Sequence, residues 1–411
     1  IRDTTPIIQL SGVTFGVLLL GEPLSRVLRA VWAQPWQKDS AMLPYYAARI
    51  IADAVEQRGE SDAAVLGIDA YLVEVEVDIT NGLPSVATVG LPHGAVKEGR
   101  ERVTAALVNA GYSFPLKRIT INLAPADVRK DGSGFDLPIA LGILAASEQL
   151  DAGGLAEQLI LGEVGLEGDL RPVRGALSMT LAARKAGLRG VILPAANLPE
   201  AAVVEGIEVR GARSLTEVCE HLGAGPRLTP IRVDVRALMA ERAADVVDFA
   251  DVRAQAGAKR ALEVAAAGAH NILLVGPPGA GKTMLARRLP SILPGMSLDE
   301  ALETTKVHSV AGLLAPGQSL CTVRPFRSPH HTISDAGLIG GGSSPRPGEV
   351  SLAHGGVLFL DELPEFRTNV LDGFRFGADR YGVPVQISNI ALITNAALVK
   401  TQPTTFSQLS K

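Results

Sequence analysis

The fold is decided by the stretch Gly276-Pro277-Pro278-Gly279-Ala280-Gly281-Lys282-Thr283, which matches the phosphate-loop pattern G-x-x-x-x-G-K-[ST]. The apolar residues 271–275 before it predict a buried parallel strand, and residues 284–289 after it predict the first turns of a helix. Strand, glycine loop and helix are the context that this motif requires. Backbone N–H groups of such a loop close around an anion, and the helix N-terminus adds a favourable dipole. We therefore predict that residues 276–283 bind phosphates, with Lys282 at the β- and γ-phosphates and Thr283 at Mg²⁺.

A second apolar run, residues 357–360, ends in the carboxylates Asp361 and Glu362. This pattern predicts a central strand with two acidic side chains at its end. Asp361 is expected to hold the Mg²⁺ shell from the side opposite Thr283. Glu362 is expected to polarise a water in line with the γ-phosphate. An Asp-Glu pair after a strand is a weak signal by itself, but together with Lys282 and Thr283 it predicts a nucleotide hydrolase that uses ATP and Mg²⁺.

Composition agrees with an ordinary globular chain. The 411 residues are 47% apolar and 20% charged, and this length predicts about two or three domains. The formal net charge of −4 gives no global positive field, so any nucleic-acid site must be local. Two cysteines far apart in the sequence, Cys219 and Cys321, fit a reducing compartment better than a disulfide framework or a zinc site. No apolar run reaches the roughly 20 residues of a membrane span, so a cytoplasmic protein without membrane contact is expected.

Four regions follow one another along the chain. Residues 1–63 form an unassigned upstream segment that could be non-native, with one helical stretch expected over Tyr45 to Glu56. Because the chain begins with Ile, a fragment or a mispredicted reading frame is expected. Residues 64–222 mix strand patterns (73–79, 118–123, 190–194) with helical patterns (92–110, 136–146, 172–186), which predicts an α/β domain. Residues 223–244 are expected to be a linker, and residues 245–411 a nucleotide-binding α/β domain with a parallel sheet.

Sequence around the two motifs narrows the class. The stretch Arg324-Pro325-Phe326-Arg327-Ser328-Pro329-His330-His331 is followed by residues 340–342 (Gly-Gly-Gly), 346–354 and 359–366. Together with residues 248–252 and 259–263, these closely resemble the magnesium-chelatase-like AAA+ ATPases of the ComM/YifB family. The resemblance covers residues from about 64 to about 375. It implies a P-loop AAA+ domain preceded by a domain similar to the Lon protease (ribosomal protein S5 domain 2-like).

The resemblance to Lon raises the question of a Ser–Lys dyad, in which a lysine accepts the proton of a serine nucleophile. The motif Lys130-Asp131-Gly132-Ser133-Gly134-Phe135-Asp136 places Gly134, not Ser133, at the nucleophile position. The position of the lysine falls at Leu177, which cannot act as a base. We therefore predict a non-proteolytic domain that serves as a scaffold for ring assembly or for contact with DNA.

The family resemblance also implies a function. It implies a homo-hexameric motor that hydrolyses ATP and acts on single-stranded or branched DNA, as a branch-migration helicase in the recombination of incoming DNA during natural transformation. Lys282 and Glu362 would be its catalytic residues. Three alternatives remain open: a magnesium-chelatase-type motor subunit, an ATP-dependent protease, and an inactive truncated product. The Lon-like domain argues against the first, because chelatase motor subunits are expected to lack it.

Some residues keep alternative interpretations. Arg324, Arg327, His330, His331 and Arg346 could line a pore that faces an anionic polymer, or could form salt bridges within or between subunits. Zinc binding by His330, His331 and His354 is disfavoured, because no cysteine or carboxylate at a suitable spacing completes a zinc site. Basic residues of the first domain, from Lys97 to Lys130, alternate with acids and are expected on a solvated face. The AAA+ domain is expected to lack its lid, and residues 392–395 could imitate a sensor strand that ends in Asn395.

Overall fold

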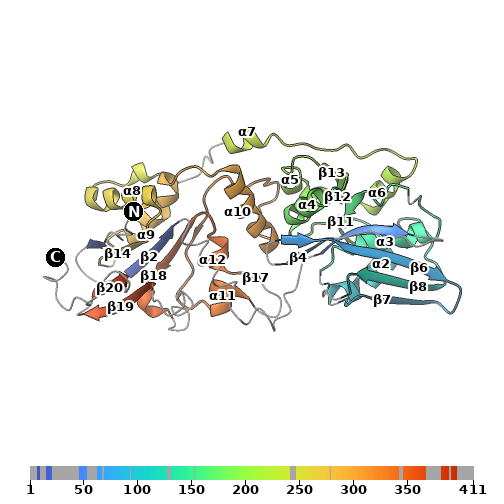
Figure 1. Ribbon diagram of the computed structural model, residues 1–411, viewed down its shortest axis with the longest axis horizontal. Coiled ribbons are helices and arrows are strands. Elements are labelled where there is room, and N and C mark those ends of the chain that lie inside the picture. The colour runs from blue at the N-terminus through green and yellow to red at the C-terminus, as the bar shows by residue number, and fades with distance from the viewer. Residues whose placement is uncertain are drawn as a thin grey trace.

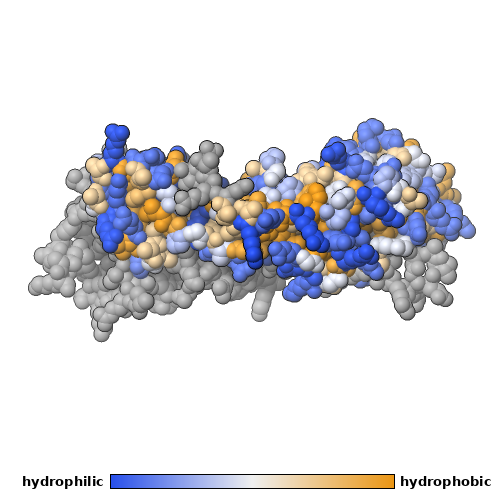
Figure 2. Space-filling model, turned by 90° about the horizontal axis from the view of Figure 1, so that it is seen from above, coloured by the Kyte–Doolittle hydropathy of each residue, from blue (hydrophilic) through white to orange (hydrophobic). Residues whose placement is uncertain are grey.

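The computed structural model describes most of the two predicted domains. It describes residues 7–9, 15–20, 46–52, 63–66, 69–92, 94–126, 130, 132–151, 153–240, 247–277, 279–341, 346–366, 381–387 and 390–395. Figure 1 shows an elongated molecule, with the N-terminal α/β domain at one end of the long axis. At the other end lies the part predicted to be an ATPase, which contains both nucleotide motifs and the residues from 247 onward and is called the ATPase half below. In the view from above, apolar residues reach the surface near the middle of the long axis (Figure 2). None of the described helices is long and apolar enough to cross a membrane.

The N-terminal domain is built on a nine-stranded mixed sheet. Its main path runs in the order β13 (Glu208–Ala212), β12 (Gly190–Pro194), β9 (Gln158–Ile160), β3 (Tyr46–Ala52), β6 (Val73–Thr80), β8 (Arg118–Ala124) and β7 (Ser85–Val89). Two short strands, β4 (Ala63–Leu66) and β5 (Asp69–Tyr71), continue from β3. Strand β6 has the expected alternation: Val73, Val75 and Val77 are buried, because one face of the sheet packs on the core.

Helices cover this sheet and complete its core. They are α2 (Ala95–Asn109), α3 (Asp136–Ala146), α4 (Ala176–Lys185), α5 (Leu198–Ala201) and α6 (Leu215–Leu222), with the short hairpin β10 (Glu163–Val164) and β11 (Leu170–Arg171) and the turn η2 (Ala195–Asn197) beside them. Helix α3 is apolar on all sides and almost every residue in it is buried, as expected for a helix inside a core. The helices and strands predicted for residues 73–194 are therefore confirmed, with shifts of a few residues at their ends.

The helix predicted over Tyr45 to Glu56 is wrong. Residues 46–52 form strand β3, which pairs in parallel with β6, Ala48 lying opposite Val73 and Ala52 opposite Val77. The segment Ala47 to Ala52, in which Arg49 interrupts the apolar residues, is too short for its period to distinguish helix from strand. Pairing with a strand about 25 residues later decides between the two, and this contact is invisible in the local pattern.

The ATPase half contains a five-stranded sheet in which the two nucleotide motifs lie on separate strands. Its order is β1 (Ile7–Gln9), β14 (Ile272–Val275), β2 (Phe15–Leu20), β18 (Val357–Asp361) and β15 (Phe326–Arg327). Strands β1 and β14 are parallel, as are β15 and β18, but β2 is antiparallel to both of its neighbours. The predicted parallel sheet is therefore found in part: the sheet is mixed, because β2 from the upstream segment lies antiparallel between the two motif strands.

Helices and turns surround this sheet (Figure 1). They are η3 (Phe249–Asp251), α8 (Ala256–Gly268), α9 (Lys282–Arg288), η4 (Leu289–Ile292), α10 (Leu298–Ala311), α11 (Asp335–Ile339), α12 (Glu349–Leu352) and η5 (Leu363–Glu365), with the small hairpin β16 (Gly340–Gly341) and β17 (Arg346–Pro347). Strands β19 (Tyr381–Ile387) and β20 (Ile390–Asn395) form a separate hairpin. Residues 392–395 therefore pair with β19 and do not join the main sheet as a sensor strand.

Helix α10 of the ATPase half packs against α4 of the N-terminal domain. Its N-terminus has a capping box in which Ser297 and Glu300 bond each other's backbone N–H groups. Met296, Ala301 and Leu320 of the ATPase half form one buried apolar cluster with Leu177, Val203 and Val204 of the first domain. Val235 joins the same cluster from α7 (Val235–Ala240), a helix inside the predicted linker. The linker region is therefore partly ordered by packing across the domain boundary.

A buried carboxylate lies in this boundary. Glu200 of α5 accepts hydrogen bonds from Ser309 Oγ of α10 and from Asn197 Nδ2, the latter at 2.7 Å. Burial raises the pKa of Glu200, and the hydrogen bonds from Ser309 and Asn197 offset only part of this effect. The folded protein therefore binds the Glu200 proton more tightly than the unfolded chain does.

The unfolding free energy is accordingly expected to depend on pH through Glu200. The contribution of Glu200 is largest below its ordinary pKa of 4.5 and is lost as the pH rises through the folded-state pKa. Glu200→Gln should remove this dependence, so the variant gains stability relative to the parent between about pH 4 and neutrality. Urea unfolding at both pH values measures the difference, with the exposed Glu205→Gln as the control. Equal pH dependence in parent and Glu200→Gln would contradict this expectation.

Candidate functional site

The phosphate loop has the predicted strand–loop–helix setting. Strand β14 is fully buried and α9 begins at Lys282. Gly279 and Gly281 have φ of 80° and 83°, a left-handed conformation that glycine adopts without steric cost. The side chain of Lys282 is buried, and its Nζ donates to the carbonyl oxygens of Gly276 and Pro277, both at 2.9 Å. Pro278 lies outside the described residues, so its predicted role stays a prediction.

The two motifs meet at their polar ends. Thr283 Oγ1 donates to Asp361 Oδ2 at 2.8 Å, although the residues are 78 positions apart. Thr283 is the second residue of α9, and Asp361 is the last residue of the buried strand β18. The structure therefore brings together the two residues predicted to share one Mg²⁺ shell. Their role as metal ligands stays a prediction, but the proximity that it requires is present.

Glu362 follows Asp361 in an unusual backbone conformation. Its φ of 55° and ψ of 46° are left-handed, which costs a non-glycine residue about 1–2 kcal/mol. The backbone N–H of Glu362 donates to Asp361 Oδ1 at 3.1 Å. Its side chain is 49% exposed, and Oε2 lies 3.2 Å from Nδ1 of His331. Backbone strain of this kind is concentrated at functional sites, and here it occurs at the predicted catalytic carboxylate.

Two residues near the site were missed as site residues by sequence reasoning. Gln255, the residue before α8, donates from Nε2 to the carbonyl of Ala280 in the phosphate loop at 3.3 Å. Its Oε1 is buried without a hydrogen-bond partner among the described residues. His331 was considered as a pore residue, a zinc ligand or a salt-bridge partner, and its contact with Glu362 agrees with the last of these. Neither residue belongs to a spaced motif, so no local signal could have identified these contacts.

Arginines proposed to face an anionic polymer are engaged inside the domain. Arg324 donates to the carbonyl of Gly355, to that of Pro294 at 2.7 Å, and to Glu300 at 3.1 Å. Arg327 forms a two-pronged ion pair with Glu349, with both N–O distances at 2.6 Å. These two arginines therefore support the salt-bridge interpretation. Arg346, in contrast, is exposed.

The histidines also have protein partners. His330 Nδ1 lies 2.9 Å from Thr332 Oγ1, and His354 Nε2 lies 3.1 Å from Glu303 Oε2. Within the described part of the chain, no group of three or more histidines, cysteines and carboxylates could hold a metal ion.

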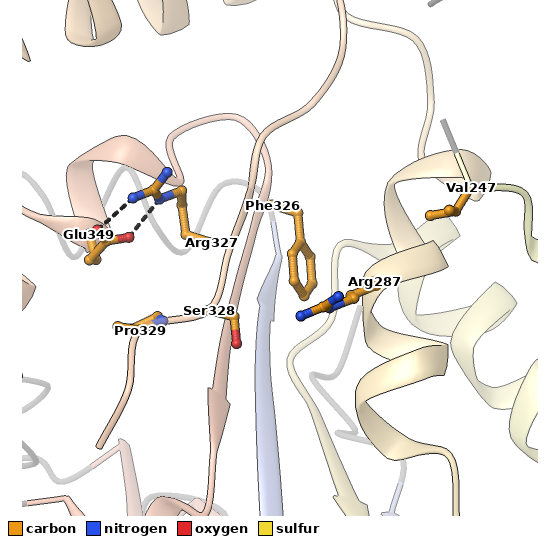
Figure 3. Close-up of a pocket in the computed structure, with 7 residues that line it drawn as sticks. All are labelled: Val247, Arg287, Phe326, Arg327, Ser328, Pro329 and Glu349. Atoms are coloured by element: carbon orange, nitrogen blue, oxygen red, sulfur yellow. Dashed lines mark hydrogen bonds and ion pairs between the residues drawn. The ribbon is translucent and has the colours of Figure 1, made fainter. Parts of the chain in front are cut away.

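A cavity of about 570 Å³ lies next to this segment. Figure 3 shows Phe326 and Arg287 side by side, while Arg327 turns toward Glu349. The described residues that line the cavity are Val247, Arg287, Phe326, Arg327, Ser328, Pro329 and Glu349. None of these belongs to the phosphate loop or to residues 361–362, so this cavity is separate from the predicted phosphate site.

The residues of the first domain that were compared with a protease dyad have other roles. Ser133 Oγ donates to the carboxylate of Glu163, not to an amine. Lys130 is fully buried, and its Nζ donates to the carbonyl of Pro125. Leu177 is fully buried in the apolar cluster between the domains. The non-proteolytic character of this domain stays a prediction.

The basic residues of that domain are less uniform than expected. Arg102 forms an ion pair with the buried Asp136 at 2.8 Å, and Lys130 is buried. Arg100, Lys117 and Arg118 are exposed, in agreement with a solvated face. Arg129 lies outside the described residues, as does the side chain of Lys97. Some of these basic side chains therefore lie in the core and others lie at the surface.

Two family models match the chain. The model described as "Magnesium chelatase, subunit ChlI" matches residues 248–400, and that described as "Subunit ChlI of Mg-chelatase" matches residues 75–197. The first match continues beyond residue 375, where the resemblance was expected to end. The second model carries the name of a chelatase subunit and matches the N-terminal domain. Contrary to the expectation from the sequence, this domain therefore does not argue against a chelatase-type motor.

Similar proteins come from several bacteria. An uncharacterized protein of Mycobacterium tuberculosis is 49% identical over 313 residues, which are 76% of this chain and 61% of the relative. The uncharacterized protein YifB of Escherichia coli is 48% identical over 315 residues (76% and 60%). The competence protein ComM of Haemophilus influenzae is 46% identical over 314 residues (76% and 61%). The chain thus spans about three fifths of the length of the curated relatives it matches.

Proposed function

Because this chain belongs to the ComM/YifB family of magnesium-chelatase-like proteins, we propose that it is an ATP-driven motor that acts on DNA. A magnesium-chelatase AAA domain implies an ATPase, and therefore the use of ATP and Mg²⁺. The observation that carries the proposal is the hydrogen bond between Thr283 and Asp361, which joins the phosphate loop to the acidic strand end. A glycine-rich turn without a ligand would not require this link between distant motifs.

The residues present fit ATP and Mg²⁺. Thr283 offers a hydroxyl and Asp361 a carboxylate, and Mg²⁺ prefers oxygen ligands of this kind. Gly279 has open space where a side chain would stand, so the backbone can approach a phosphate closely. When bound, Mg²⁺ would neutralise charge on the β- and γ-phosphate oxygens.

The protein groups would then share the work of hydrolysis. Lys282 would bind the phosphates through its ammonium group, which is close to the loop carbonyls of Gly276 and Pro277. Glu362 would orient the attacking water and take its proton as the water oxygen bonds to the γ-phosphorus and the bond to ADP breaks. Thr283 and Asp361 would hold Mg²⁺ between them. These roles support ATP hydrolysis in the ATPase half.

DNA is the proposed polymer because of the family. One relative is named competence protein ComM. We infer single-stranded or branched DNA as the partner, a homo-hexameric ring as the active form, and branch migration during recombination of incoming DNA as the process. The exposed Arg346 is one residue of the ATPase half that is available to a phosphate backbone.

The test is ATP turnover with and without DNA. Single-stranded and branched DNA are expected to stimulate steady-state ATP hydrolysis several-fold over duplex DNA, and added salt should weaken the stimulation because phosphate contacts are screened. Lys282→Ala and Glu362→Gln should lower both the basal and the stimulated rates by at least about 10²-fold. Equal turnover with and without every DNA form would contradict a DNA-directed motor.

A chelatase-type motor is the second candidate, since both family models carry a chelatase description. The same assay separates the two functions. Absence of DNA stimulation, together with saturable binding of a metal-free porphyrin measured by its fluorescence, would favour the chelatase role.

A further inference from the structure

The cavity beside β15 combines a cation with an aromatic ring. Its volume of about 570 Å³ lies within the range of about 300–1,000 Å³ that small-molecule sites have. Arg287 is an exposed residue in the last turn of α9, and it forms no hydrogen bond or ion pair among the described residues. Phe326 of β15 is half-buried, and Figure 3 shows the guanidinium of Arg287 next to the Phe326 ring. The N–H donors of Arg287 are therefore available to a ligand that also meets this ring.

The charges on the other side of the cavity are balanced (Figure 3). Arg327 and Glu349 form a two-pronged ion pair, with both N–O distances at 2.6 Å. This pair adds no net charge and holds its two side chains in one geometry. Among the described lining residues, Arg287 is thus the charged one without a described counterion. A single uncompensated positive charge in a cavity favours an anion.

The core holds the aromatic ring in place. Phe326 stacks on the buried Phe359 of β18, with ring centroids 6.2 Å apart and an angle of 26° between the ring planes. A ring fixed in this way loses little conformational freedom when a planar ligand stacks on it. Ser328, two residues further on, is exposed, and its hydroxyl can donate or accept a hydrogen bond at the same cavity. The lining therefore offers a stacking surface, a cation and a hydroxyl to one ligand.

We propose that this cavity binds a nucleotide unit with a single phosphate, the base stacked on Phe326 and the phosphate held by Arg287. Stacking on an aromatic side chain accepts every base, and a guanidinium matches the oxygens of a phosphate. One phosphate matches the one uncompensated cation. The unit has two sources, a free nucleoside monophosphate or one nucleotide of single-stranded DNA. The site goes beyond the proposed ATPase function, since none of its described lining residues belongs to the phosphate loop.

The experiment measures the binding of two probes in the presence of saturating ADP and Mg²⁺, which fill the phosphate loop. Radiolabelled thymidine monophosphate is followed by equilibrium dialysis, and a short fluorescein-labelled oligothymidine strand by fluorescence anisotropy. Arg287→Gln should weaken binding about tenfold or more, the effect of losing a hydrogen bond to a charged group, and Arg287→Lys, which keeps the charge, should lose less. Phe326→Leu should weaken binding about fivefold or more through lost stacking. Arg260→Gln, at an exposed arginine of α8, is the matched control and should bind like the parent.

Competition by parts of the ligand tests both halves of the site. Thymidine has the base without the phosphate, and deoxyribose phosphate has the phosphate without the base. Each should displace the radiolabelled probe at least about tenfold less well than unlabelled thymidine monophosphate does. Deoxyribose phosphate that competes as well as the whole nucleotide would overturn the stacking on Phe326, and thymidine that does so would overturn the role of Arg287.

The two probes identify the source of the nucleotide unit. Weaker binding of thymidine monophosphate alone in Arg287→Gln supports a free nucleotide, and weaker binding of the oligothymidine strand supports single-stranded DNA. Parent-like affinity of Arg287→Gln for both probes, or no binding of either probe to the parent, would overturn the site. Because Arg287 is exposed, this comparison holds even if Phe326→Leu does not fold. Failure of the proposed ATPase appears separately, as parent-like ADP affinity and ATP turnover in Lys282→Ala.

Discussion

Lys282→Ala is expected to lower ATP turnover on the order of 10²-fold, because it removes the one positive charge that the phosphate loop contributes. The described partners of Nζ are two carbonyl oxygens, those of Gly276 and Pro277. A buried ammonium with neutral partners is costly to maintain, which is consistent with a place reserved for an anion. Binding of a fluorescent ATP analogue measures the change in nucleotide affinity, and steady-state ATP hydrolysis measures the change in turnover.

The matched control is Lys185→Ala, which removes an exposed lysine at the end of α4. It should change neither nucleotide binding nor turnover. Circular dichroism establishes that Lys282→Ala is folded, which is expected because the variant loses a buried charge and no ion pair among its described contacts. Parent-like nucleotide affinity in Lys282→Ala would show that the loop binds phosphates without this lysine.

Glu362→Gln is expected to bind ATP like the parent and to lose the chemical step by about 10²–10⁴-fold, the usual contribution of a general base. Glutamine has the same shape but cannot take a proton, and residues 276–283 are untouched. Single-turnover hydrolysis of radiolabelled ATP measures the chemical step. Equilibrium nucleotide binding measures the affinity for ATP.

Glu365→Gln is the control for this prediction. Glu365 is exposed and belongs to the same short turn, η5, so the variant changes charge nearby without changing the proposed base. It should hydrolyse ATP at the parent rate. A rapid single turnover in Glu362→Gln would mean that another group accepts the proton.

Much of the site could be predicted because its signals are local. Gly276 to Thr283 and Asp361-Glu362 are short motifs that follow apolar runs, and the structure places each motif at a strand end. The hydrogen bond between Thr283 and Asp361 confirms that the motifs meet. The strand β6 and the buried helix α3 were predicted correctly for the same reason, since alternation and a continuous apolar segment are local patterns.

The rest depended on contacts between distant segments. Residues 46–52 are a strand because β6 pairs with them. Residues 15–20 separate β14 from β18, so the motif strands are not neighbours. Arg327 is held in an ion pair by Glu349. No local period encodes any of these partners, since each comes from far along the chain.

By itself, the sequence determined the chemistry that the ATPase half can perform: glycine, lysine and threonine at fixed spacing, and two carboxylates after an apolar strand. These depend on residue type and on periods of a few residues, which are local properties. Only the tertiary structure decided how that chemistry is arranged: Thr283 against Asp361, Glu362 turned toward His331, and Glu200 of one domain against Ser309 of the other. Strand order and packing set these distances, because a side chain meets its distant partner only when the fold closes.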